Sequence, residues 1–159
     1  HSQPGDALEN KTLPGVLMDY TEVLFLQSEA AARGWGGDAS ALYQAAVNQS
    51  VTDWTGTAAT AAFLNKVHYD SLMAAPNNKT WKEVIATQKW VALYNRGFEA
   101  WSTWRLYDAP TMNVSAEAGT TPPTRYNYSV DEYSINGTSV SAANSGSDLV
   151  TDKVFWDVN

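Results

Sequence analysis

The sequence predicts a mainly α-helical fold, in which helical hairpins at about 14–109 lie beneath a loop-rich cover at about 110–159. Apolar residues recur at spacings of three and four in the first part, as on one face of a helix. Glycine and proline-asparagine clusters interrupt that pattern, as turns between helices do. After residue 109 the composition shifts to Thr, Ser, Asn, Gly and Pro, which favours loops.

The first two predicted helices form a hairpin. One runs over 14–33, where Tyr20 and Leu24 belong to the apolar face and Gly34 is a typical stop. Asp38 or Ser40 can cap the second helix, because a short polar side chain accepts a hydrogen bond from the first turn. The run Gly34-Trp35-Gly36-Gly37 supplies the turn between them.

Two further helices are predicted before the loop-rich cover. The third spans about 57–75 and ends at Pro76-Asn77-Asn78. The fourth runs from 80 to about 104, and its start Thr80-Trp81-Lys82-Glu83 fits a capping box, in which Thr and Glu satisfy each other's backbone N–H groups.

The cover is predicted to be ordered loops with short strands at 126–133 and 154–158. Its aromatic content argues against disorder. We expect five of its rings to be buried against the helices: Tyr126, Tyr128, Tyr133, Phe155 and Trp156.

Composition excludes several function classes. A net charge of −7 and a pI near 4.6 oppose nucleic-acid binding, which needs surplus Lys and Arg. There is no cysteine, so disulfides and thiolate metal sites are excluded. No apolar run approaches the roughly 20 residues of a membrane helix. Seven Trp and eight Tyr supply flat apolar faces with polar edges, which suit sugar rings or protein interfaces.

Four segments occur in an order that resembles the SusD/RagB superfamily. Residues 20–34 are similar to that family's Y-x-E-V-x-F-x-x-A-E-A-x-x-R-G helix, and Leu42-Tyr43 through Ser50 to its following helix. The most specific match is Q-K-W-V-A-L-Y at 88–94 with E-A-W at 99–101 and Trp104-Arg105. The last segment comprises P-T-R-Y-N-Y at 123–128 and D-K-V-F-W-D at 152–157.

Two parts of the sequence, one residue and one stretch of four, depart from the family pattern. Ser129 stands where the family usually has proline, and residues 105–108 replace a usual Arg-Arg-Thr-Gly. We therefore expect the adjoining loop to differ in shape.

The resemblance implies that residues 1–159 are the C-terminal part of a single SusD-like domain with tetratricopeptide-like hairpins. It implies a nutrient-binding protein on the extracellular face of a bacterial outer membrane, held by a lipid anchor on a preceding part of the protein. The implied ligand is an oligosaccharide or a peptide, the implied partner is a SusC-like TonB-dependent transporter, and no cofactor or catalytic step is implied.

Candidate ligand-binding residues lie in two places. Trp35 sits among glycines, where it either forms a stacking platform or packs into the hairpin turn, and packing is favoured. The loop at 111–128 offers the better candidates, Asn113, Arg125, Tyr126 and Tyr128. Flat rings, an amide and a guanidinium are the groups that hold sugar hydroxyls or peptide carbonyls.

Two other function classes stay open, a glycan hydrolase and a helical-repeat interaction module. Glu22 and Glu29 lie seven residues apart, about 10.5 Å along a helix. This is too far for the carboxyl pair of most glycosidases, and Glu29 has Arg33 as an ordinary i+4 partner.

Metal and relay sites are also not indicated. In a continuous helix His68 and Asp70 would point apart, so neither a metal site nor a Ser-His-Asp relay is expected there. Asp152 and Asp157 flank an aromatic segment, but their spacing does not match a dedicated calcium loop.

Overall fold

The computed structural model describes residues 6–114, 121–144 and 147–157, which form eight helices and contain no β-strand. The predicted mainly α fold is thus confirmed. The helices are α1 (Asp6–Glu9), α2 (Tyr20–Ala32), α3 (Ala39–Thr55), α4 (Ala61–Lys66), α5 (Tyr69–Met73), α6 (Trp81–Ala92), α7 (Gly97–Tyr107) and α8 (Val130–Ala143).

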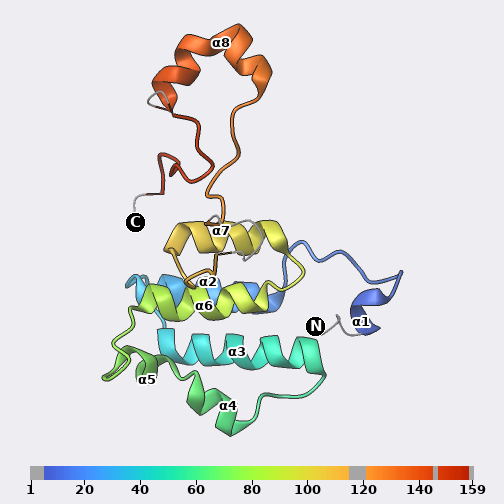
Figure 1. The fold of residues 1–159 in the computed structure, drawn as a ribbon. Coiled ribbons are helices and arrows are strands. Elements are labelled where there is room, and N and C mark those ends of the chain that lie inside the picture. The colour runs from blue at the N-terminus through green and yellow to red at the C-terminus, as the bar shows by residue number, and fades with distance from the viewer. Residues whose placement is uncertain (1–5, 115–120, 145–146, 158–159) are drawn as a thin grey trace.

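Helices α2, α3 and α6 contact one another and form the centre of the fold, as Figure 1 shows. Helix α7 packs on α6, while α4 and α5 lie against α3 on the opposite side. Helix α8 stands apart from these layers at the end of two extended segments (Figure 1). No helix in the described ranges is long and apolar enough to cross a bilayer.

The main core is built where α2, α3 and α6 meet. Phe25, Tyr43 and Ile85 are at most 1% exposed, and the Phe25 and Tyr43 rings meet edge to face at 6.1 Å. The Tyr43 hydroxyl donates to the Val67 carbonyl at 3.0 Å, so its one polar group is satisfied within the core.

The hairpin and capping predictions agree with the structure. Asp38 caps α3 by accepting from the Ala41 N–H, and Gly34 follows α2 with φ of 84°. Thr80 and Glu83 form both hydrogen bonds of the capping box.

Three predicted helix boundaries were wrong. The first helix begins at Tyr20 because the Asp19 side chain caps it. The third predicted helix is divided into α4 and α5 at Val67, whose carbonyl accepts a hydrogen bond from the Tyr43 hydroxyl. The fourth is divided into α6 and α7 at Asn95, which has a left-handed φ of 69°.

The predicted strands at 126–133 and 154–158 were also wrong where the structure describes them. Ser129 accepts from the Glu132 N–H and thereby starts α8, a helix where loops and a strand were expected. The departure from the family's proline therefore coincides with a helix cap.

Candidate functional site

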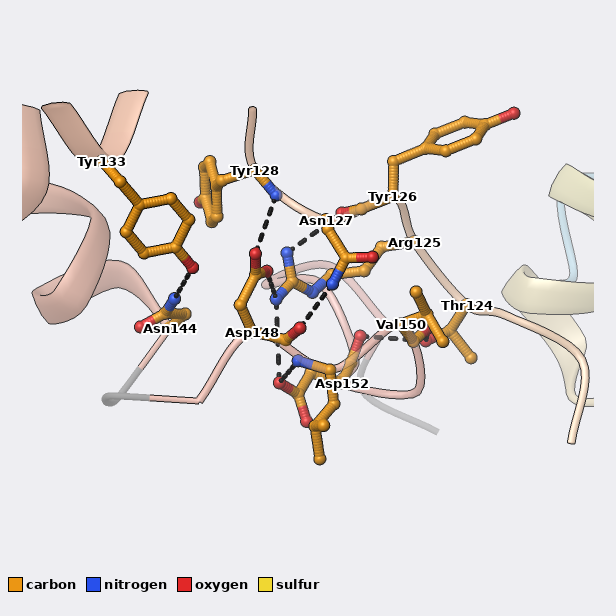
Figure 2. A network of polar contacts seen from close by, with 11 residues as sticks. Thr124, Arg125, Tyr126, Asn127, Tyr128, Tyr133, Asn144, Asp148, Val150 and Asp152 are labelled. Carbon is orange, nitrogen blue, oxygen red and sulfur yellow. Dashed lines mark hydrogen bonds and ion pairs between the residues drawn. The ribbon is translucent and has the colours of Figure 1, made fainter. Parts of the chain in front are cut away.

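Two segments far apart in sequence are joined beside α8 (Figure 2). The Arg125 guanidinium donates to the Asp148 carboxylate at 2.5 Å and lies 3.7 Å from that of Asp152. The Thr124 N–H donates to the Val150 carbonyl at 2.8 Å, and the Asn127 side-chain amide donates to the Asp148 carbonyl. These bonds fix residues 124–128 against residues 148–152.

Asp148 is the centre of this network. Besides Arg125, its carboxylate accepts from the Tyr128 backbone N–H at 3.0 Å. Burial alone raises the pKa of this carboxyl, but hydrogen bonds from Tyr133, Arg125 and the Tyr128 backbone outweigh burial and leave the pKa below its ordinary value. Asp148 is therefore a preferentially ionised acceptor that holds the two segments together.

Helix α8 borders the network through Tyr133. The Tyr133 hydroxyl accepts a hydrogen bond from the Asn144 side-chain amide at 3.3 Å (Figure 2). Burial and the neighbouring Asp148 carboxylate raise the pKa of the Tyr133 phenol, so it stays a neutral donor at ordinary pH. Both ends of α8 thus take part in the same cluster of polar groups.

A pocket of about 510 Å³ opens next to this network, a volume within the range of small-ligand sites. Its lining comes from the segment before α8, the end of α8 and the C-terminal segment. These residues are Arg125, Tyr128, Ala143, Asn144, Ser147, Asp152, Lys153, Val154 and Phe155.

The C-terminal wall of the pocket is anchored to α7. The Arg105 guanidinium lies between two rings, 4.2 Å from the Trp101 centroid and 4.6 Å from that of Trp156. Lys153 bridges Asp108 at 2.8 Å and Asp157 at 3.1 Å. These cation–π and ionic contacts hold residues 153–157 in place opposite Tyr128.

The pocket contains two of the five predicted ligand-binding residues, Arg125 and Tyr128. Tyr126 does not line it: this ring is 73% exposed, meets Trp101 edge to face at 5.6 Å, and points away from the network (Figure 2). Asn113 is exposed and is likewise outside the lining.

Trp35 belongs to a different part of the fold, the turn between α2 and α3. It is 80% exposed, so the favoured prediction that it packs into the turn was wrong. The glycines on both sides have positive φ, which lets the turn close without using the indole.

The expected burial of the cover's aromatic rings was wrong as well. Tyr126, Tyr128, Tyr133, Phe155 and Trp156 are all between 38% and 94% exposed. Helix α8, with Tyr133, extends away from the helical layers (Figure 1), and Tyr126 and Trp156 touch α7 at Trp101 and Arg105 without being buried there. Tyr128 and Phe155 instead give the pocket its aromatic surface.

Sequence reasoning missed Asp148, Asn144 and Phe155. Asp148 acts on residues about 20 positions earlier, and its local sequence Ser-Gly-Ser-Asp carries no binding motif. The spacing from Ser129 to Glu132, typical of a capped helix start, was the one signal that could have revealed α8 and thus the wall containing Asn144.

The carboxylates considered for hydrolysis are engaged elsewhere. Glu22 pairs with Arg96 at 2.7 Å, and Glu29 pairs with Arg33 at 2.9 Å as expected. Glu22 therefore balances a charge at the junction of α6 with α7, whereas Glu29 balances one at the end of its own helix.

His68 and Asp70 do not point apart as predicted, because the helix does not continue through His68. The imidazole Nδ1 lies 3.9 Å from Asp70 Oδ2, and the Ser40 hydroxyl donates to the same oxygen at 2.7 Å. The serine thus bonds to the carboxylate and not to the imidazole, which is not the order of a nucleophilic relay.

Asp152 and Asp157 are also held by protein groups. Asp152 accepts from the Leu149 N–H at 3.0 Å, and Asp157 pairs with Lys153. Within the described residues no three His, Cys, Asp or Glu side chains cluster as a metal site would require.

The arrangement can hold a hydroxyl-rich ligand. Tyr128 and Phe155 offer flat faces, and Arg125, Asn144, Asp152 and Lys153 bring both donors and acceptors to the lining. Arg125 is already committed to Asp148, so its main task is to shape the pocket and orient Tyr128, whose ring lies 5.3 Å from the guanidinium carbon.

The chain matches a known family and several solved structures. Residues 1–129 match a SusD-like family described as starch-binding and associating with the outer membrane. A structure titled a chitin-binding protein is 32% identical, with a TM-score of 0.67, over 88% of this chain and 33% of that one. No curated protein matches significantly.

Two other solved structures are also similar to the chain. A SusD-like protein from Bacteroidetes is 26% identical with a TM-score of 0.68, over 92% of this chain and 31% of that one. A SusD homologue from Bacteroides thetaiotaomicron is 28% identical with a TM-score of 0.67, over 92% of this chain and 39% of that one. The chain thus spans about a third of the length of the structures it resembles.

Proposed function

Because the chain belongs to the SusD-like family, we propose that its parent protein captures a glycan at the outer surface of a bacterial outer membrane without transforming it. The observation that carries the proposal is the family match, which covers most of the chain. The relative titled a chitin-binding protein supports a polysaccharide as the ligand class.

We assign the chain to the C-terminal part of a single SusD-like domain, and the pocket beside α8 to glycan contact. Tyr128 and Phe155 would stack on sugar rings, while Asn144 and the neighbouring polar groups would meet hydroxyls. The Asp148–Arg125 pair would keep the pocket walls in register. Binding would therefore need no covalent step.

The remaining parts of the proposal concern the parent protein. It would be held at the membrane by a lipid on another segment and would pass its ligand to a SusC-like TonB-dependent transporter. Co-purification of the tagged parent with that transporter from solubilised outer membranes tests the partnership, and recovery of the parent without it would contradict the partnership.

Retention on polysaccharides tests the function directly. The purified chain is passed over chitin, starch and a casein peptide resin, and retention on at least one polysaccharide but not on the peptide resin is expected. Tyr128→Ala should reduce retention, whereas Ile135→Ala, which removes an 87% exposed side chain of α8 outside the pocket lining, should not.

The hydrolase alternative is tested on the same samples. The polysaccharide that retains the chain is analysed by chromatography after long incubation with it, and full recovery of the intact polymer is expected. Release of shorter products by the wild-type chain, absent from a Glu22→Gln, Glu29→Gln double variant, would contradict the proposal.

A further inference from the structure

A second pocket, of about 530 Å³, lies where the segment entering α2, the C-terminal end of α3 and the junction of α6 with α7 meet. We call it the junction pocket. It shares no lining residue with the pocket beside α8. Neither the proposed glycan site nor the core accounts for its surface.

Four aromatic side chains from separate segments line the junction pocket, and each keeps about half or more of its surface exposed. Trp54 and Tyr94 hold each other edge to face at 5.5 Å with an interplanar angle of 76°, which fixes the orientation of both rings. Tyr20 and Phe98 are 63% and 69% exposed. Such flat apolar faces match the C–H face of a pyranose ring.

The polar part of this lining carries an excess of hydrogen-bond acceptors. Asp53 accepts from the neutral side chains of Thr21 at 2.7 Å and Gln49 at 2.8 Å, so its negative charge has no cationic partner in these contacts. Each carboxylate can accept about four hydrogen bonds. Asp19 and Glu99 also line the pocket, but the Asp19 carboxylate is already paired with Arg96 at 3.4 Å and caps α2.

Arg96 is the cationic residue in the lining, and its guanidinium already binds other groups of the protein. Its side chain is only 9% exposed, and Nη2 donates to the Leu17 carbonyl and the Glu22 carboxylate, both at 2.7 Å. These bonds tie the segment entering α2 to the junction of α6 with α7, so Arg96 holds the pocket walls together. The balance of free groups therefore favours a ligand that donates hydrogen bonds and carries positive charge.

We propose that the junction pocket binds a sugar unit through stacking on Trp54 and Tyr94, with an amino sugar bound best, a neutral sugar less well and a uronic acid least well. The protonated amine of an amino sugar supplies the positive charge that Asp53 does not receive from Thr21 or Gln49. This site is separate from the pocket beside α8, and the proposal for it does not depend on glycan binding at that pocket.

Titration calorimetry with three trisaccharides tests the proposed order. Glucosamine, glucose and galacturonic acid trimers are titrated into the chain in mildly acidic, low-salt buffer that protonates the amine. The glucosamine trimer is expected to bind roughly tenfold more tightly than the glucose trimer, as a near contact between partly exposed charges predicts. The galacturonic acid trimer is expected to bind most weakly.

Variants locate the effect. Asp53→Asn keeps the side-chain shape and should bring the glucosamine trimer down to the affinity of the glucose trimer. Asp131→Asn makes the same charge change at an exposed position in the first turn of α8 and should leave the ratio unchanged. Trp54→Ala should weaken both trimers, with circular dichroism confirming that the helices are retained.

Several results would overturn the proposal. Equal or reversed affinities for the three trimers would do so, as would equal effects of Asp53→Asn and Asp131→Asn. Loss of the glucosamine preference in Tyr128→Ala would assign it to the other pocket. If Trp54→Ala changes the molar mass in solution but no sugar affinity, the junction pocket is a protein contact and not a sugar site.

Discussion

A buried ammonium group shows how charge is balanced at the level of single residues. Lys89 is 7% exposed between acidic residues of α2. Burial lowers the pKa of its amine, and the nearby carboxylates of Glu22 and Glu29 only partly oppose this effect. Because those carboxylates also pair with Arg96 and Arg33, Lys89 is not their only cation.

Lys89→Met should therefore stabilise the fold. We expect the free energy of unfolding at neutral pH to rise by about 1 kcal/mol, because the variant removes the desolvation cost of the ammonium group while Glu22 and Glu29 keep their arginine partners. With a folded pKa below the unfolded value of about 10.4, the wild type should also gain stability as pH rises between those two pKa values.

Urea unfolding of the variant, with Lys66→Met as an exposed control, measures this change. Lys89→Met should lack the alkaline gain, and the control should stay within about 0.5 kcal/mol of wild type. A less stable Lys89→Met would mean that the carboxylates of α2 require this ammonium group.

Asp148 predicts a pH dependence confined to the loop around α8. Its folded pKa lies below the unfolded value of about 3.9. The stabilisation is thus fully present above the unfolded pKa and is lost as pH falls through the folded pKa. Protection of the Tyr128 amide against hydrogen exchange, corrected for the intrinsic rate, should fall across that acidic range while core amides stay protected.

Asp148→Asn is the matching variant. It keeps the shape of the side chain but removes the charge, so the Tyr128 amide should be poorly protected at every pH. Equal protection in both proteins would show that Asp148 does not hold the loop.

At the level of elements, capping residues allowed helix starts to be predicted from sequence. The Thr80–Glu83 capping box and the Asp38 cap use side chains within three residues of the bonds they make, so local sequence contained the signal. The break at Val67 coincides with a hydrogen bond from Tyr43, and Arg96, next to the break at Asn95, pairs with Asp19 and Glu22. These partners are distant in sequence, so the local sequence did not reveal either break.

Loss of the capping box should destabilise the chain measurably. Thr80→Ala is expected to lower the free energy of unfolding by about 1 kcal/mol, because α6 packs against α2, α3, α5 and α7 and its first turn loses an N–H partner. Thr87→Ala removes a hydroxyl that bonds only within α6 and serves as the control in the same denaturation experiment. A difference of less than about 0.3 kcal/mol between the two would contradict this role of the cap.

The candidate site shows the same division between local and distant signals. Arg125 and Tyr128 could be proposed because ring and guanidinium lie within one short segment. The other wall of the pocket is brought there by α8 and by the anchoring of residues 153–157 on α7, and only the fold reveals it. Trp35 was a candidate because an aromatic ring stands among glycines, yet it belongs to the turn between α2 and α3 and does not line the pocket.

At the scale of the whole molecule, α8 is separated from the helical layers (Figure 1). One pocket is lined by residues at α8 and the other by residues of the packed helices. The first pocket is shaped by one polar network centred on Asp148, whereas the second is shaped by helix packing and Arg96. Unfolding the loop around α8 should therefore abolish the first pocket and leave the second intact.

The proposed function requires that the pocket beside α8 binds a glycan through Tyr128. The decisive test is titration calorimetry, in which an oligosaccharide of the polysaccharide that retains the chain is titrated into the wild type, Tyr128→Ala and Ile135→Ala. We predict saturable binding by the wild type and Ile135→Ala, and about tenfold weaker binding by Tyr128→Ala, equivalent to about 1.4 kcal/mol. Equal affinities of all three proteins, or no binding by the wild type, would contradict the claim.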